Sequence, residues 1–187
     1  GLILRHFQLT LSAVTPSPRP RTMTVDASLT LRAHAACRIL VCDDSAADVT
    51  YLAGLLKSSG YTDVTALTDS RQALELIERY HFDLILLDIK MPFVDGLEVI
   101  QAVRLRHSAA DLPVLVITGA NSTGTRNAAL AAGANDYLTK PVDPVEMSLR
   151  ARNLLTIRTI HLANLRIQDG LEQEVRARTA KLDMLIE

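Results

Sequence analysis

The stretch DLILLDIKMPFVDG, residues 83–96, decides the fold of this chain. From Leu84 to Leu87 it is apolar without alternation, which is typical of a strand buried on both faces of a parallel sheet. The apolar run stops at one carboxylate, Asp88, and Asp95-Gly96 then opens an amphipathic run. Ligands of open α/β sheets bind outside the carboxyl ends of the strands, so Asp88 lies where chemistry is expected. Taken alone, Asp88 is equally well explained as a cap of the strand or of the next helix.

Strand and helix patterns alternate on both sides of this stretch. Strands are predicted at 37–42, 63–67, 82–87, 113–118 and 136–139, and helices at 45–59, 69–77, 97–105, 122–132 and from about 144. Five such strand–helix units predict an α/β fold with a doubly wound parallel sheet between layers of helices. We expect residues 37–155 to form this domain.

The last helical pattern continues past the domain. Residues 150–187 contain no proline, and Gly170 is their only helix breaker. Apolar residues and one asparagine follow the 3-4-3-4 spacing of a coiled-coil seam, which is made of Ile157, Ile160, Asn164, Ile167 and Leu171. The spacing then slips at Val175. We predict a helical linker over 156–187 that forms a homodimer and leads toward an output domain; one long helix packed back on its own domain is the alternative.

Composition limits the classes of function. The chain has 187 residues, 48% of them hydrophobic, which suffices for one core with flanking segments. A net charge of -1 gives no field toward nucleic acid or an anionic membrane. Aromatic residues make up 4%, with no Trp, which disfavours stacking on single-stranded nucleic acid. No apolar run approaches the ~20 residues of a membrane span, so we expect neither nucleic acid nor membrane as a direct partner.

Two features near the N-terminus complete the outline. Residues 1–22 carry three arginines, no acidic residue and the turn-rich run TPSPRP, so we expect 1–36 to be an extension outside the core. A signal peptide, or translation that starts at Met23, is the alternative. Cys37 and Cys42 lie too close along one strand to staple a fold, and we interpret them as buried, reduced thiols of a cytoplasmic protein.

Polar residues collect where the predicted strands end. Asp43 and Asp44 follow the first strand, Asp88 the third, Thr118 the fourth and Lys140 the fifth. Three carboxylates at one edge repel one another and favour a hard cation, for which Mg²⁺ is the best fit. A carboxylate nucleophile, a metal, a hydroxyl and an ammonium are the groups needed to accept a phosphoryl group.

At these residues the sequence resembles the receiver domain of bacterial two-component response regulators. The resemblance runs from about 37 to 155 and rests on the motifs LVCDD, LLDIKMPFVDG, VLVITGA and GANDYLTKP. It implies a flavodoxin-like (βα)5 fold and a signalling module that catalyses only its own phosphorylation and dephosphorylation. The partner that it implies is a histidine kinase or phosphotransfer protein, which phosphorylates Asp88.

The resemblance also implies roles for the neighbours of Asp88. Asp44 and Asp88 would bind Mg²⁺ directly, Asp43 mainly through water, and Lys90 through its backbone carbonyl. Thr118 and Lys140 would hold the phosphoryl oxygens. The complete set of motif residues disfavours a degenerate receiver.

A switch aromatic and a cis peptide bond are further implications of the resemblance. Tyr137 would move inward as Thr118 shifts toward the phosphate, and the Lys140–Pro141 bond would be cis. Gly119 would leave room for the phosphodonor.

The tail resembles signalling linkers. LEQEVRARTAKL, residues 171–182, is similar to linkers that lead to cyclic-di-GMP phosphodiesterases of the HD-GYP type. Similar linkers precede diguanylate cyclases and hybrid histidine kinases, so the class of output domain stays open. His161 lacks the surroundings of a phosphorylated kinase histidine, and we interpret it as a solvated helix residue.

Three other functions account for fewer of these sequence features. Haloacid-dehalogenase-like phosphatases need a second acid two residues after the nucleophile, where this chain has Lys90. A flavodoxin-like FMN site needs a phosphate-binding loop after the first strand, where Asp43-Asp44 would repel a phosphate. A purely structural dimerisation module accounts for the tail but not for the polar residues at the strand ends.

Overall fold

The structure, a computed structural model, describes residues 36–119 and 123–186, with side chains described as far as Lys181. Apart from Ala36, the extension predicted over 1–36 lies outside these residues. The helices among them include none that is both long and apolar enough to cross a membrane.

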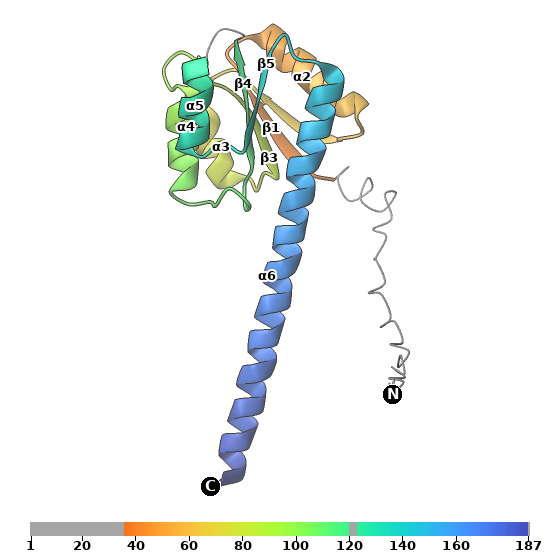
Figure 1. The fold of residues 1–187 in the computed structure, drawn as a ribbon, viewed down its shortest axis with the longest axis vertical. Helices are drawn as coiled ribbons and strands as arrows, with labels where there is room; N and C mark the ends of the chain where they lie inside the picture. The colour runs from red at the N-terminus through yellow and green to blue at the C-terminus, as the bar shows by residue number, and fades with distance from the viewer. Residues whose placement is uncertain (1–35, 120–122, 187) are drawn as a thin grey trace, which may run out of the picture.

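A five-stranded parallel sheet forms the centre of the fold (Figure 1). Its strands are β1 (Arg38–Cys42), β2 (Asp63–Leu67), β3 (Leu84–Asp88), β4 (Val114–Gly119) and β5 (Asp136–Lys140), in the order β2-β1-β3-β4-β5. The chain moves outward from β1 to β2 and then returns to the other side of β1 at β3. Strand order therefore reverses between β1 and β3, the place where doubly wound sheets bind ligands. The predicted fold class is confirmed.

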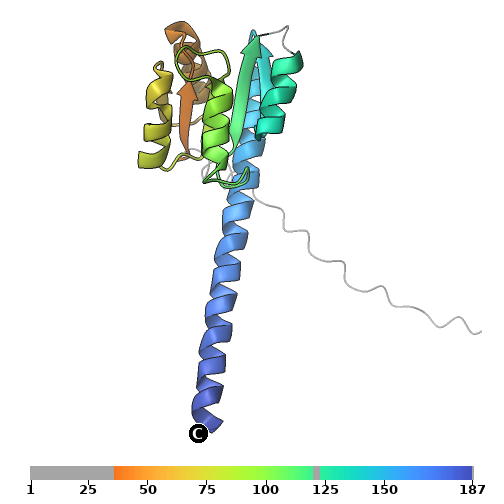
Figure 2. The ribbon, with the colours of Figure 1, turned by 90° about the vertical axis from the view of Figure 1, so that its left-hand side faces the viewer.

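Helices cover both faces of the sheet. They are α2 (Ala46–Ser58), α3 (Ala73–Arg79) after the short 3-10 helix η1 (Ser70–Gln72), α4 (Gly96–Arg104), α5 (Thr123–Ala132) and α6 (Pro144–Ile186). Buried residues of α2 and α6 share one apolar cluster, and those of α3, α4 and α5 share the other. Figure 1 shows the sheet between these two layers, and Figure 2 looks onto the layer of α3, α4 and α5, with the sheet behind it.

The central strands explain the unbroken apolar runs of the sequence. In β3, Leu84 and Leu86 belong to the cluster under α2 and α6, whereas Ile85 and Leu87 belong to the cluster under α3, α4 and α5. All four are at most 1% exposed. A strand with helices on both sides has no polar face, as the absence of alternation in residues 84–87 predicts.

Two side-chain caps fix the helices that start at the carboxyl edge of the sheet. The Ser45 hydroxyl accepts a hydrogen bond from the Asp48 amide at 3.3 Å and begins α2. Asp95 and Glu98 form a reciprocal capping box, with bonds of 2.9 and 3.0 Å, and begin α4. These caps end both connecting loops, after β1 and after β3, at defined residues.

Helix α6 has two parts (Figure 1). Met147, Ala151, Leu154 and Leu155 are buried against the sheet, whereas residues 163–181 are exposed. The 43 residues of α6 span about 64 Å at ~1.5 Å per residue. The helix continues through Gly170, and its exposed part does not pack back on its own domain, contrary to the alternative considered above.

Candidate functional site

The predicted polar residues meet at the carboxyl edge of the sheet. Strand register pairs Asp88 with Ile117 and Gly119 with Lys140, so the ends of β3, β4 and β5 are level. Asp43 directly follows β1, which is the neighbour of β3. Three of the predicted residues, Asp43, Asp88 and Lys140, are in contact with one another through the lysine.

Lys140 is the centre of this cluster. Its Nζ donates hydrogen bonds to Asp43 Oδ2 at 2.7 Å and to Asp48 Oδ2 at 2.8 Å. It also pairs with Asp88 Oδ1 at 3.1 Å. Asp48 was not among the predicted site residues, although its place in the first turn of a helix capped by Ser45 puts it at this edge. One ammonium group therefore contacts three carboxylates.

Burial makes this arrangement electrostatically expensive. Asp43 is 1% and Asp88 6% exposed. Burial raises the pKa of Asp88, Lys140 lowers it and Asp43 raises it again, and the net shift is upward. Burial alone would lower the pKa of Lys140, but its three carboxylate partners raise it, so the side chain stays charged.

The same carboxylates act on the neighbouring thiol. Burial, followed by the negative charges of Asp43 and Asp88, raises the pKa of Cys42 to about 12. Cys42 is buried, Cys37 is half-buried, and neither is in a disulfide, so Cys42 is an unreactive thiol of the core.

The cluster has the composition of a site for a hard cation, but its oxygens now face Lys140. Within the described part of the chain, no three His, Cys, Asp or Glu side chains form a ready-made metal site. Three carboxylates against one ammonium leave an excess of negative charge, and Asp44 lies exposed beside Asp43. An oxygen-only donor set with excess negative charge fits Mg²⁺.

The loop between β3 and α4 is closed at its base and clamped at its tip. A side chain at Gly96 would lie 2.3 Å from the Asp88 carbonyl oxygen, so only glycine fits there. Ser70, which is 2% exposed, donates to the Pro92 carbonyl at 2.6 Å and accepts from the Val94 amide at 3.3 Å. Nothing local in the sequence places Ser70 beside this loop.

The proposed switch residues lie on β4, which neighbours β3, and on β5, the edge strand beyond it. Thr118 is 2% exposed at the end of β4. Tyr137 on β5 is half-buried, with the Arg126 guanidinium 5.0 Å and that of Arg150 5.9 Å from its ring centroid. The Lys140–Pro141 peptide bond is cis, as predicted.

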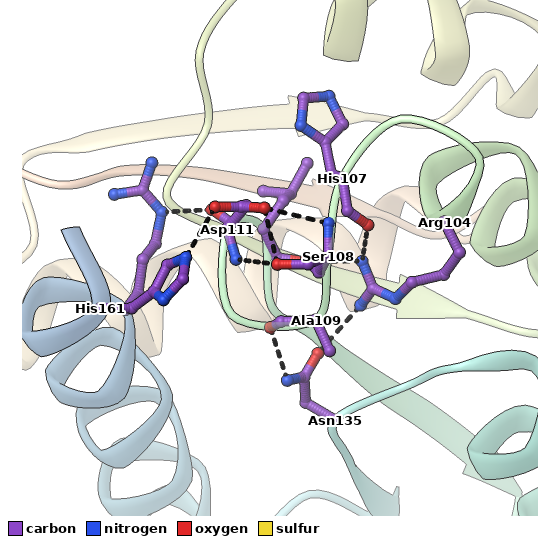
Figure 3. A network of polar contacts seen from close by, with 9 residues as sticks. Arg104, His107, Ser108, Ala109, Asp111, Asn135 and His161 are labelled. Carbon is purple, nitrogen blue, oxygen red and sulfur yellow. Dashed lines mark hydrogen bonds and ion pairs between the residues drawn. The ribbon is translucent and has the colours of Figure 1, made fainter. Parts of the chain in front are cut away.

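The opposite edge of the sheet holds a second polar network (Figure 3). The interpretation of His161 as a solvated residue is wrong, because its Nε2 lies 2.9 Å from Asp111 Oδ1. Arg158, one turn earlier on α6, donates to the Asp111 carbonyl at 2.7 Å and pairs with Asp83 Oδ1 at 2.6 Å. These contacts hold α6 at the point where it leaves the domain.

Arg104 extends this network to the other layer of helices. Its guanidinium donates to the carbonyls of Gly133 at 2.8 Å and Leu112 at 2.9 Å, and to Asn135 Oδ1 at 3.0 Å. Asn135 in turn donates to the Ala109 carbonyl at 2.8 Å (Figure 3). The loops before β4 and β5 are therefore tied to the end of α4.

Comparison with known proteins agrees with this geometry. Residues 39–152 match the family described as response regulator receiver domain. The response regulator MprA of Mycolicibacterium vanbaalenii is 45% identical over 118 residues, which cover 63% of this chain and 50% of that protein. MprA of Mycobacterium ulcerans matches with the same identity and coverage. The chain thus spans about half the length of the curated relatives it matches.

Solved structures show the same fold. A CheY-like receiver domain protein from Methanospirillum hungatei is 30% identical with a TM-score of 0.61, over 67% of this chain and 98% of that one. A two-component response regulator/GGDEF domain protein is 27% identical with a TM-score of 0.66, over 70% of this chain and 53% of that one.

Proposed function

The chain belongs to the response regulator receiver domain family, and on that premise we propose that Asp88 accepts a phosphoryl group from a histidine kinase or phosphotransfer protein. The observation that supports this most is the sharing of Lys140 by Asp43, Asp48 and Asp88 at the carboxyl edge of the sheet. The module would act in the cytoplasm, and the absence of a disulfide at Cys37 and Cys42 is consistent with that compartment.

In the proposed transfer, a carboxylate oxygen of Asp88 attacks the phosphorus of a phosphohistidine. The P–N bond breaks, its electron pair stays on the imidazole, and an aspartyl phosphate forms. Lys140 already contacts Asp88 and is charged, so its ammonium is in position to hold a phosphoryl oxygen. The Thr118 hydroxyl, at the end of the adjacent strand, would hold a second one.

Asp44 and Asp88 would hold Mg²⁺ directly, with the Lys90 carbonyl, and Asp43 would contribute mainly through water. Both Asp43 oxygens already accept hydrogen bonds, Oδ2 from Lys140 and Oδ1 from the Ser45 amide, which supports this indirect role. When bound, Mg²⁺ neutralises charge on the transferred phosphoryl group. The Lys90 amide donates to the Asp88 carboxylate and helps orient it for attack.

Contacts between β5 and Arg150 would couple the phosphorylated site to α6. Thr118 and Tyr137 form the proposed two-state element, and Tyr137 lies beneath Arg150 of α6. Arg150 also pairs with Asp136, the first residue of β5, at 2.5 Å. An inward movement of Tyr137 would therefore change the packing of an α6 side chain directly.

We also propose that α6 forms a parallel homodimer. Its seam residues Ile157, Ile160, Ile167 and Leu171 are 55–60% exposed. Such a stripe on a helix beyond its own domain is stable in water when a second copy covers it. Asn164 would pair across the seam and fix its register. Two output domains, such as phosphodiesterase, cyclase or kinase domains, would then lie side by side.

Incubation with phosphoramidate and Mg²⁺, followed by intact-mass and peptide mass spectrometry, tests the proposed function. We expect one phosphoryl group on Asp88, stable in acid and lost in mild base, and none in Asp88→Asn. Phosphorylation at another residue, or an unmodified wild-type chain, would contradict the proposal.

A further inference from the structure

Phe93, at the tip of the loop between β3 and α4, is not explained by folding. Its φ is 72°, in the left-handed region that a bulky side chain adopts only at a cost. Its side chain is 75% exposed, so little apolar burial compensates for the strain. A residue that is both strained and exposed beside a functional site is a candidate for recognition.

The loop holds Phe93 in place from both sides. The Ser70 hydroxyl bonds the Pro92 carbonyl and the Val94 amide, which flank Phe93 in the sequence. At the base of the loop, the Gly96 amide donates to the Ile89 carbonyl at 2.9 Å and closes it. The tip is thus fixed relative to Asp88, from which the loop begins.

Arg71 orders the ring itself. Its guanidinium carbon lies 4.4 Å from the Phe93 ring centroid, and two hydrogen bonds of 2.9 Å tie the guanidinium to Asp69. One part of the ring is covered by this cation, and the rest faces outward. A side chain ordered before binding loses little conformational entropy when a partner covers it.

We propose that Phe93 is a docking anchor for the protein that donates the phosphoryl group to Asp88. The inference rests on the proposed function, since it assumes that Asp88 is the acceptor. Asp88 is 6% exposed, so a phosphohistidine on another protein reaches it only if that protein covers the edge from which the loop emerges. The donor surface would offer an apolar pocket for the ring, with acidic groups toward the exposed side chains of Lys90 and Arg71.

The test compares two phosphodonors. Phosphoramidate needs no docking surface, whereas a protein donor does. The protein donor is the phosphorylated cytoplasmic part of whichever histidine kinase, in a panel from the source organism, phosphorylates the wild-type chain fastest. Phe93→Ala should lower kcat/KM for transfer from that kinase about 30-fold, the loss typical of a buried aromatic anchor, and change the phosphoramidate rate less than twofold.

Three further variants separate docking from folding. Phe93→Gly also lacks the ring but accepts the positive φ, so it should melt about 3 °C above Phe93→Ala while losing as much kinase transfer. Phe93→Tyr keeps the ring and should stay within threefold of wild type. Leu105→Ala removes another exposed side chain, 87% exposed at the far end of α4, and should leave both reactions unchanged.

Each other outcome overturns the inference. Equal kinase transfer in wild type and Phe93→Ala would show that the ring is no anchor. A parallel loss with both donors would place its role in the acceptor chemistry. Loss of self-association in light scattering with unchanged transfer would assign the ring to a second copy of the chain. Failure of phosphoramidate to label wild-type Asp88 would instead contradict the proposed function, and is distinguishable for that reason.

Discussion

Asp88 and Asp111 lie at opposite edges of the same sheet, and their surroundings shift their pKa values in opposite directions. Burial raises the pKa of Asp88, which shares one lysine with two other carboxylates. Hydrogen bonds from Ser108, and then the contact with His161, lower the pKa of Asp111 despite some desolvation (Figure 3). The carboxyl edge holds negative charge in excess, whereas the amino edge pairs its acidic groups with donors and cations.

This difference separates the part of the molecule that is built for chemistry from the part that holds the elements together. Groups whose charge is left unbalanced are available to a metal or a phosphoryl group, at the expense of stability. Groups that are satisfied, such as Arg104 and Asp111, contribute stability and fix the exit of α6. Mutations at the two edges should therefore change stability in opposite directions, and equal effects would contradict this difference.

The largest effect is expected at Asp88. Asp88→Asn should abolish phosphorylation and at the same time raise the melting temperature, because it removes a buried charge next to Asp43. Mg²⁺ should raise the melting temperature of wild type more than that of the variant, by linkage to the folded state. Thermal melts with and without Mg²⁺ measure both effects. Equal Mg²⁺ shifts in the two proteins would show that Asp88 is not a ligand.

Arg104 should give the opposite change in stability. Arg104→Met removes charge-assisted bonds to Gly133, Leu112 and Asn135 and leaves their acceptors unpaired, which should cost about 3 kcal/mol. Urea denaturation measures the loss. Arg106→Met, at an exposed arginine that pairs with Glu78, is the control and should change stability by less than ~0.5 kcal/mol. Similar losses of stability in both variants would mean that the Arg104 network contributes no more than an exposed ion pair.

The exposed part of α6 offers the next test, on oligomeric state. Ile160→Lys combined with Ile167→Lys places charges on the seam and should make the chain monomeric at tens of micromolar in light scattering. Leu165→Lys, off the seam on the same helix, should leave the dimer intact. A wild-type chain that is already monomeric would rule out the proposed dimer.

Thr118 should be needed for the switch but not for the phosphorylation of Asp88. Thr118→Ala should still be phosphorylated at Asp88, but amide shifts in β5 and the start of α6 should be reduced by more than half, because the hydroxyl no longer biases Tyr137. Two-dimensional NMR with a phosphoryl analogue such as BeF₃⁻ reports these shifts. Thr139→Ala, at the β5 residue in register with Thr118, is the control. A wild-type pattern in Thr118→Ala would refute the proposed switch.

The smallest effect is expected at Asp111, and it depends on pH. The pKa of Asp111 is lowered in the folded chain, so its ionised form stabilises the fold above the ordinary value of 3.8, and this stabilisation is lost as the pH falls through the folded value. Asp111→Asn should cost about 0.5 kcal/mol at pH 7, a small amount because the side chain is partly exposed. Urea denaturation across pH should show the cost shrinking in acid; a cost independent of pH would assign it to hydrogen bonding alone.

Much of the fold and of the candidate site was predictable from local patterns. Apolar runs without alternation locate β1, β3 and β4, and cap residues such as Ser45 and Asp95 locate helix starts to within a residue or two. Because parallel strands end at a common edge, the residues that follow them were expected to meet, and the contacts of Lys140 with Asp43 and Asp88 confirm this.

The contacts that complete the two edges were decided only by tertiary structure. Asp48 joins Lys140 across 92 residues, and His161 joins Asp111 across 50. Ser70 clamps the loop of Phe93 from a different strand–helix unit. Periodicity and caps depend on residues within one or two turns, so the sequence alone determined the elements and the edge at which the acids lie. The packing of those elements decides which charged groups share one partner and which have partners of their own. The reason is that side-chain contacts between distant segments follow from the placement of whole helices and strands.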